Sequence, residues 1–186
     1  MISDPVSELL AKQEIYELCC RYIRGLDRAK RELMRAAFHD DAVFDLGYIK
    51  VGPDEFCDFG IEALASHEGT HHMLANTLIE FDGDTTAYGE IYFHAHHRLE
   101  AGDHLLSSEN AQMVPVSTHV RSDLIVAGRY VDRYEKRDGV WKIAYRAELV
   151  DWARTQATQD GFFDQQPETL RGSRVDDLVF ARDRLR

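Results

Sequence analysis

Histidine is the residue type in this chain best suited to move protons near neutral pH, because its unperturbed pKa lies near ~6.5. Two of the nine histidines are adjacent, His71 and His72, near the start of the stretch GTHHMLANTLIEF. The alternation of this stretch predicts a β-strand, so the two imidazoles would point to opposite faces of a sheet. At most one of them can then face a given pocket, where a carboxylate is the usual partner that orients an imidazole. The alternative is a buried histidine whose hydrogen bond serves only the fold.

A second group of histidines, His94, His96 and His97, lies on one predicted strand. His94 and His96 would share a sheet face, which suits zinc or iron when a third ligand such as Glu90 joins them. No second metal motif accompanies them, so we expect no metal and no other cofactor, and we expect His94 and His96 to line a pocket or an intersubunit surface. The remaining histidines fall in predicted loops or helix ends and are interpreted as surface residues: His39, His67, His104 and His119.

The elements that would position these residues follow from the spacing of the apolar residues. A spacing of three to four residues predicts helices over 5–26, about 31–38 and about 53–66. Alternation predicts long strands over 71–81, 86–100, 124–137 and 140–152. A hairpin turn at Asp138 and Gly139 would join the last two strands, and the polar stretch 101–123 is expected to be an excursion or a lid. Helices followed by a meander of strands indicate an α+β fold.

The composition is that of a single globular domain. The chain has 186 residues, of which 44% are hydrophobic, and a chain of this size can bury a substantial core. It carries 22 Lys and Arg against 33 Asp and Glu, a net charge of -11. Such an acidic chain is not expected to bind nucleic acid or an anionic membrane surface.

The cysteines and the N-terminal residues indicate in which cellular compartment the protein is expected. Three cysteines, of which Cys19 and Cys20 are adjacent, form neither a disulfide framework nor a CxxC pair, so a reducing, cytoplasmic location is expected. The first residues lack the basic and then apolar order of a signal peptide, and no apolar run approaches ~18 residues. We therefore expect no membrane partner.

Three ordered segments carry a family resemblance: RYIRGLDR, HHM at the start of a strand, and YEKRDGVWKI. Together they resemble the SnoaL-like group of the nuclear transport factor 2-like (scytalone dehydratase-like) superfamily, over about residues 8–152. The resemblance implies a cystatin-like, cone-shaped barrel, in which a strongly curved mixed β-sheet wraps around N-terminal helices and encloses a deep pocket. Residues 1–152 would form this cone, and residues 153–186 would form a C-terminal extension that packs on the sheet or on a neighbouring subunit. The resemblance also implies a homo-oligomer, a dimer or a trimer, that buries the convex face of the sheet.

Within the superfamily, the chain is most similar among enzymes to hexachlorocyclohexane dehydrochlorinase and bile acid 7α-dehydratase, which eliminate a group from an alicyclic ring. Their pattern places catalytic residues on four positions of this sequence. The segment RYIRGLD supplies Tyr22 and Asp27, HHMLANTLIEF supplies His72, and GVWKIAYR supplies Arg146. The resemblance thus implies that one of the paired histidines is a base and that its neighbour, His71, is not.

These implied roles are chemically consistent with one another. The carboxylate of Asp27 would accept the ring N–H of His72 and stabilise the imidazolium that forms when the other nitrogen removes a proton. Tyr22 could donate a hydrogen bond to a leaving hydroxyl or to an enolate, and Arg146 could stabilise the negative charge there. Tyr22 and Asp27 are five residues apart, which separates them by about 140° on a helix. Gly25 is therefore expected to bend or end the helix between them.

Two classes of function follow from the resemblance. The first is a cofactor-independent lyase, a dehydratase or a related eliminating enzyme, or else an isomerase, acting on an apolar cyclic molecule that is steroid-like or polyketide-like. The second is a non-catalytic small-molecule-binding or accessory protein that uses the same pocket. The fold alone does not choose between them, but a His72–Asp27 pair favours the enzyme. The substrate pocket is further expected to include Tyr92, Tyr130, His94 and His96.

Overall fold

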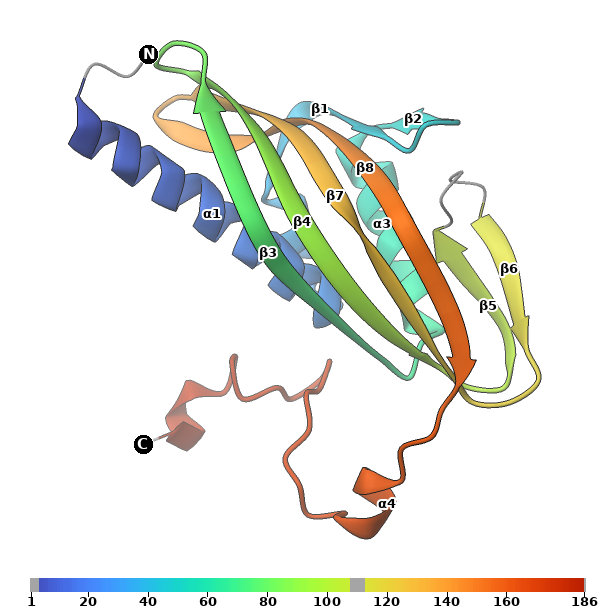
Figure 1. The fold of residues 1–186 in the computed structure, drawn as a ribbon. Coiled ribbons are helices and arrows are strands. Elements are labelled where there is room, and N and C mark those ends of the chain that lie inside the picture. Colours follow the sequence, from blue (N-terminus) through green and yellow to red (C-terminus); the bar gives the residue numbers. More distant parts are fainter. Residues whose placement is uncertain (1–3, 108–112, 186) are drawn as a thin grey trace.

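The structure is a computed structural model that describes residues 4–107 and 113–185 (Figure 1). Its helices are α1 (Pro5–Asp27), α2 (Arg31–Arg35), α3 (Pro53–Ala65), α4 (Phe162–Gln165) and the 3₁₀ helix η1 (Arg182–Leu185). Its strands are β1 (Phe38–Asp45), β2 (Lys50–Val51), β3 (Gly69–Phe81), β4 (Thr86–Leu99), β5 (Gly102–Ser107), β6 (Met113–Thr118), β7 (Ser122–Arg137) and β8 (Val140–Ala157). The predicted helices and long strands are present, with ends shifted by a few residues. Among the described residues, no helix is long and apolar enough to cross a membrane.

Six strands form one mixed sheet in the order β2-β1-β8-β7-β4-β3, in which β1 and β8 are parallel and all other neighbours are antiparallel. The four long strands curve together, and α1 and α3 lie on the same side of them (Figure 1). Helix α1 contacts β3 and β8, and α3 contacts β1. The architecture is therefore the predicted α+β cone of a curved mixed sheet around helices. The sheet remains open, with β2 and β3 at its edges, so it is not a closed barrel.

Helix α1 begins at a favourable cap. The side chain of Asp4 accepts a hydrogen bond from the backbone N–H of Ser7 at 2.9 Å, and Pro5 occupies the first helical turn. The helix then runs without interruption to Asp27, so the expectation that it ends at Gly25 is wrong. A β-carbon at Gly25 would lie 2.5 Å from the backbone nitrogen of Met34, so the glycine allows α2 to approach the helix. Both Tyr22 and Asp27 are buried because strands and helices surround this end of α1.

The strands alternate as predicted. On β4 the buried side chains are those of Ala87, Ile91, Phe93, Ala95, His97 and Leu99, and the side chains between them face outward. Strands β7 and β8 meet at the predicted turn, where Asp138 and Gly139 have φ values of 50° and 81°. These left-handed values match a tight two-residue hairpin turn. The stretch between β4 and β7 forms a separate hairpin of β5 and β6, a structured excursion whose residues 108–112, and the side chain of His104, lie outside the described part.

The segment after the cone returns to one end of it (Figure 1). Strand β8 continues to Ala157, beyond the boundary expected at residue 152. Arg174 then donates from Nη1 to the backbone oxygen of His67 at 3.0 Å, and Lys30 donates from Nζ to the backbone oxygen of Arg174 at 2.8 Å. An ion pair joins Arg28 to Asp177 at 3.3 Å. The extension is thus held against the end of α1 and the start of β3.

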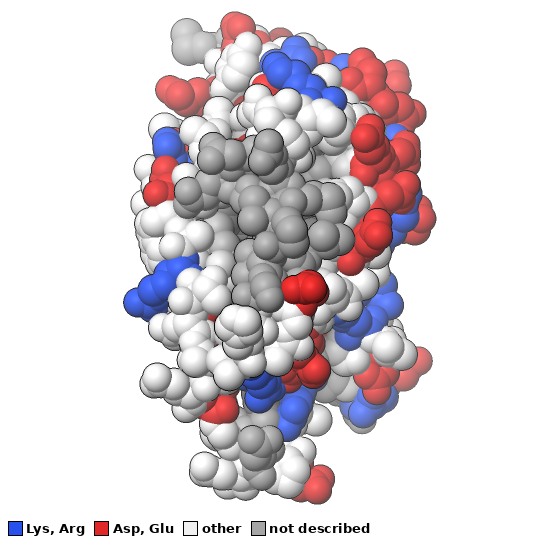
Figure 2. All heavy atoms as spheres, turned by 90° about the vertical axis from the view of Figure 1, so that its right-hand side faces the viewer, with Lys and Arg blue, Asp and Glu red and all other residues white. Residues whose placement is uncertain are grey.

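The surface reflects the acidic composition. Asp and Glu side chains gather along one side of the face that carries the β5–β6 hairpin (Figure 2). Helix α3 alone carries four acids in its 13 residues: Asp54, Glu55, Asp58 and Glu62.

Candidate active site

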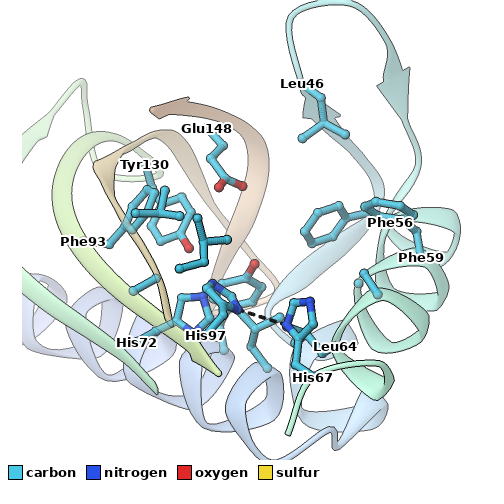
Figure 3. A pocket seen from close by; sticks show the side chains of 17 residues that line it. Leu46, Phe56, Phe59, Leu64, His67, His72, Phe93, His97, Tyr130 and Glu148 are labelled. Atoms are coloured by element: carbon cyan, nitrogen blue, oxygen red, sulfur yellow. Dashed lines mark hydrogen bonds between the residues drawn. The ribbon is translucent and has the colours of Figure 1, made fainter. Parts of the chain in front are cut away.

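A cavity opens between helices α1 and α3 and the inner face of the curved sheet (Figure 3). Its volume is about 70 Å³. Most of its wall is apolar: Leu26, Leu46, Phe56, Phe59, Gly60, Ala63, Leu64, Phe93, Ala95, Leu124 and Val126. Six polar side chains complete it: Tyr22, His67, His72, His97, Tyr130 and Glu148. A few ionisable groups thus share an otherwise apolar enclosure, the usual composition of a small-molecule site.

His72 and Asp27 form the predicted pair. Nδ1 of His72 lies 2.7 Å from Oδ1 of Asp27, and the backbone N–H of His72 donates to Oδ2 at 2.9 Å. Both side chains are only 7% exposed. Burial by itself would raise the pKa of Asp27, but the hydrogen bonds and charge of His72 outweigh it and lower that pKa. Because an ionised carboxylate only accepts hydrogen bonds, Nδ1 of His72 carries a proton, and Nε2 of the neutral ring keeps its lone pair.

Two further imidazole rings, those of His97 and His67, follow one after the other beside His72. The ring of His97 lies edge-on to His72 and to His67, with centroids 5.1 Å apart in each case, and Nδ1 of His97 is 3.2 Å from Nδ1 of His67. Burial, and then the charges of the neighbouring histidines, hold the pKa of His97 well below its usual range. His97 is therefore neutral in the cavity.

Sequence reasoning missed the position of both residues. His67 was assigned to the surface because it follows the end of α3, yet it is buried. His97 was considered only with the metal hypothesis, although a recognisable signal was available. It is the one histidine on the face of β4 that is otherwise apolar, next to Phe93, Ala95 and Leu99.

Arg146 lies behind the cavity wall. It is fully buried and binds Asp132 through two hydrogen bonds, from Nε at 2.8 Å and from Nη2 at 2.6 Å. Its guanidinium carbon lies 4.5 Å from the ring centroid of Tyr22 and 4.2 Å from that of Tyr130. Tyr22 and Tyr130 line the cavity, as expected, whereas Arg146 does not. The expectation that Arg146 meets the substrate is therefore corrected: it supports the two tyrosine rings instead.

Three other expected pocket residues lie on the outer face of the sheet. Tyr92 is exposed beside the guanidinium of Arg129. The rings of His94 and Trp152 are neighbours, with their centroids 6.1 Å apart. Nε2 of His96 is 2.9 Å from Oδ1 of Asp123. The reason for the correction is the pleat of β4, which turns its odd-numbered side chains inward and these even-numbered ones outward.

The same pleat bears on the metal hypothesis. His94 and His96 are outside while His97 is inside, so the three rings do not converge on one ion. In the described part of the chain, no group of three His, Cys, Asp or Glu side chains is arranged to hold a metal.

Glu148 is an ionisable residue of the cavity that the sequence analysis does not single out. Its carboxyl group points into the cavity from β8, opposite the labelled imidazoles (Figure 3). Burial raises the pKa of Glu148, and the opposing charges of His72 and Arg146 reduce this effect only in part. The period of the strand was a signal, because Glu148 follows Arg146 by two residues and so shares its face.

Comparison with known proteins gives a family and a fold. The family model of the SnoaL-like domain matches residues 7–147. A search of curated proteins found no match. The chain is similar in structure to a hexachlorocyclohexane dehydrochlorinase (LinA) type 2, with a TM-score of 0.66 and 20% identity over 83% of this chain and 94% of the other.

Two more solved structures share the architecture. A scytalone dehydratase-like protein from Novosphingobium aromaticivorans DSM 12444 has a TM-score of 0.65 and 22% identity, over 84% of this chain and 94% of the other. A protein of unknown function with a cystatin-like fold from Nostoc punctiforme PCC 73102 has a TM-score of 0.56 and 21% identity, over 76% and 92%. At these identities the likeness is one of fold.

Proposed function

The chain belongs to the SnoaL-like family, and from this premise we propose that it is a cofactor-independent lyase that eliminates a group from a small cyclic molecule. The observation that carries the proposal is the His72–Asp27 pair, buried at the wall of an apolar cavity. A cavity that only binds an apolar ring needs no buried carboxylate paired with an imidazole beside it, because desolvating the charge of Asp27 is costly. The names of two proteins with the same fold, a dehydrochlorinase and a scytalone dehydratase-like protein, also denote elimination and support this class.

In the proposed reaction, His72 is the general base. Its Nε2 removes a proton from a ring carbon next to an electron-withdrawing carbonyl, and Asp27 stabilises the resulting imidazolium. The hydroxyl groups of Tyr22 and Tyr130 can donate hydrogen bonds to the enolate oxygen that develops. Burial keeps the pKa of both tyrosines above its usual value, so both hydroxyls retain their protons for this purpose. Isomerisation would use the same proton abstraction without loss of a group.

The cavity volume supports a small substrate. At about 70 Å³ the cavity is well below the ~300–1,000 Å³ of typical ligand pockets. We therefore propose a substrate of one or two rings, in preference to a four-ring steroid. Its walls of Phe56, Phe59 and Phe93 suit an apolar ring.

The experiment that tests this function is proton exchange in D₂O. Cyclohexanone and 2-tetralone serve as one-ring and two-ring probes, and loss of the α-proton signals is followed by NMR. The wild-type chain is expected to catalyse the exchange. His72→Ala should lower the rate by at least ~10²-fold, because a general base contributes about that much. Asp27→Asn should be comparably slow, since an amide stabilises the imidazolium poorly.

The matched control is His71→Ala. His71 is exposed and points to the opposite face of β3, so its removal should leave the exchange rate unchanged. Replacing His72 and Asp27 together should cost little more than replacing one, as for residues that act as a unit. A wild-type chain that binds these ketones without exchanging their protons would instead be a binding protein.

A further inference from the structure

Glu148 is an ionisable group of the cavity that the base mechanism leaves unused. It is partly buried on β8, and its register partner on β7 is Tyr130, another cavity residue. Among the residues that the structure describes, none forms a hydrogen bond or an ion pair with its carboxyl group. A carboxyl group in an apolar wall without a protein partner needs water, a ligand or a proton to satisfy it, since leaving it unpaired is costly. Glu148 is therefore placed to meet a polar group of a molecule bound in the cavity.

The position of Glu148 relative to the base narrows its role. His72 comes from β3 at one edge of the sheet, and Glu148 comes from β8, separated from β3 by β4 and β7. The curvature of the sheet turns both side chains toward one cavity, close enough for their charges to interact (Figure 3). A ring bound between them would present one bond to the imidazole and another to the carboxyl group. Elimination of water benefits from such a pair, a base for the departing proton and an acid for the departing oxygen, because hydroxide is a poor leaving group.

We propose that Glu148 is the proton donor to the leaving group in an elimination of water, an inference that rests on the proposed lyase function. Nε2 of His72 takes the proton from the ring carbon, and the electrons of that C–H bond form the new C=C bond. The C–O bond of the neighbouring carbon breaks, its electron pair stays on oxygen, and the Glu148 carboxyl group supplies the proton that completes water. The products are the unsaturated ring and water, with His72 charged and Glu148 ionised. Return of the proton from the imidazolium to the carboxylate restores both groups.

The other polar groups of the cavity are less suited to this step. His72 accepts the first proton, and His97 is engaged with His67 through Nδ1. Tyr22 and Tyr130 are weaker acids than usual, because burial raises the pKa of each. The same burial raises the pKa of Glu148, against the charges of His72 and Arg146, which lets its carboxyl group hold a proton at higher pH than an exposed one. Glu148 thus combines access to the cavity with a transferable proton.

The test compares two leaving groups on one ring. The probes are 3-hydroxycyclohexanone, whose hydroxyl leaves only with a proton, and 3-(4-nitrophenoxy)cyclohexanone, whose phenolate leaves as the anion. Glu148→Gln is expected to slow the loss of water by ~10²-fold or more, the usual contribution of a general acid. Loss of 4-nitrophenolate and proton exchange on cyclohexanone should stay near the wild-type rate. Glu148→Asp keeps an acid and should recover part of the loss.

Two controls separate this role from the proposed function. His72→Ala should slow both eliminations, and Glu14→Gln, the same change on the exposed side of α1, should slow neither. A wild-type chain that neither exchanges protons nor releases 4-nitrophenolate refutes the lyase function, and the role of Glu148 falls with it. A wild-type chain that releases 4-nitrophenolate but not water, or a Glu148→Gln variant that loses water at the wild-type rate or slows both leaving groups equally, overturns the role of Glu148 alone.

Two measurements that do not depend on catalysis, thermal unfolding and NMR titration, complete the test. A carboxyl group whose pKa is raised by folding stabilises the fold below its unfolded pKa and loses this contribution as pH rises. Glu148→Gln should therefore raise the thermal unfolding midpoint at pH 7 relative to wild type, with a smaller difference near pH 4. Carbon-13 NMR of the side-chain carboxyl groups, assigned with the same variant, should show Glu148 titrating above ordinary glutamates. Titration in the ordinary range would overturn the proposal.

Discussion

His72 has two polar neighbours that differ in charge: Asp27, which is bonded to its Nδ1, and His97, which lies in the cavity wall. Asp27 is ionised, because hydrogen bonds from His72 lower its pKa despite burial, and His97 is neutral, because burial lowers its pKa. The ring of His72 therefore has a negative partner at Nδ1 and no positive charge from its neighbour His97. The ring thus has the orienting carboxylate that the proposed base needs.

The neutrality of His97 predicts a pH dependence of stability. The unfolded chain binds a proton at this histidine near pH ~6.5, whereas the buried ring binds one only at lower pH. Acidification below about 6.5 therefore favours the unfolded state. His97→Gln should reduce the fall in the free energy of unfolding between pH 7.5 and 5.5, measured by urea denaturation. The control is the exposed His71→Gln, which should keep the wild-type slope, and an unchanged slope in His97→Gln would contradict the prediction.

The residues of the site differ in how far the sequence could predict them. Asp27 and His72 were located by resemblance, and the structure joins them as expected. Tyr92, His94 and His96 were placed in the pocket because alternation gives two faces without saying which is inside. Glu148 and His67 come together with His72 only through the curvature of the sheet and the end of α3. The strand period puts Glu148 on the face of Arg146, but its long-range proximity to His72 leaves no local pattern in the chain.

At the scale of elements, a buried ion pair links the neighbouring strands β7 and β8. Asp132 accepts two hydrogen bonds from Arg146 and one from the hydroxyl of Tyr134 at 2.5 Å. Asp132 and Arg146 are both nearly inaccessible to solvent. The guanidinium in turn lies against the rings of Tyr22 and Tyr130. The ion pair thus links the strand pairing to the wall of the cavity.

This arrangement predicts that removing one partner of the Asp132–Arg146 pair strongly lowers the free energy of unfolding. Asp132→Ala should lower the free energy of unfolding by about 3–5 kcal/mol, because it leaves the charge of Arg146 buried and unpaired. Replacing both residues with apolar ones, as in Asp132→Leu with Arg146→Met, should cost less than the single change. Urea denaturation of the single and double variants measures these differences. The exposed pair of Asp41 and Arg137, 2.7 Å apart, is the matched control, and Asp41→Ala should cost much less.

The elements themselves were largely predictable. The apolar spacing placed the helices, and alternation placed the long strands and the hairpin at Asp138 and Gly139. The β5–β6 hairpin was predicted only as an excursion, because its polar sequence carries a weak strand signal. Gly25 was read as a helix breaker, but its function is steric, since it admits the backbone of α2. A close approach between two helices depends on tertiary packing, which a single glycine in a sequence does not reveal.

At the scale of the whole molecule, the outer face of the sheet carries a row of three apolar side chains and one histidine. Met73 on β3, His94 on β4, Ala127 on β7 and Trp152 on β8 are register partners across four strands. Met73 and Trp152 are 53% and 48% exposed. Exposed apolar residues that lie side by side commonly mark an interaction surface. We therefore keep the expectation of a homo-oligomer that buries this face.

The oligomer predicts the effect of one charge on this face. Trp152→Glu would place a carboxylate in the centre of the interface, where desolvation makes an unpaired charge costly. Sedimentation velocity should show a dimer or trimer for the wild-type chain and a shift toward the monomer for the variant. Leu170→Glu is the control, because Leu170 is also highly exposed but lies in the C-terminal extension, and it should leave the sedimentation profile unchanged. A wild-type chain that sediments as a monomer, or variants that dissociate equally, would contradict the interface. Proton exchange on cyclohexanone by the monomeric variant should continue, since every group that lines the cavity comes from one chain.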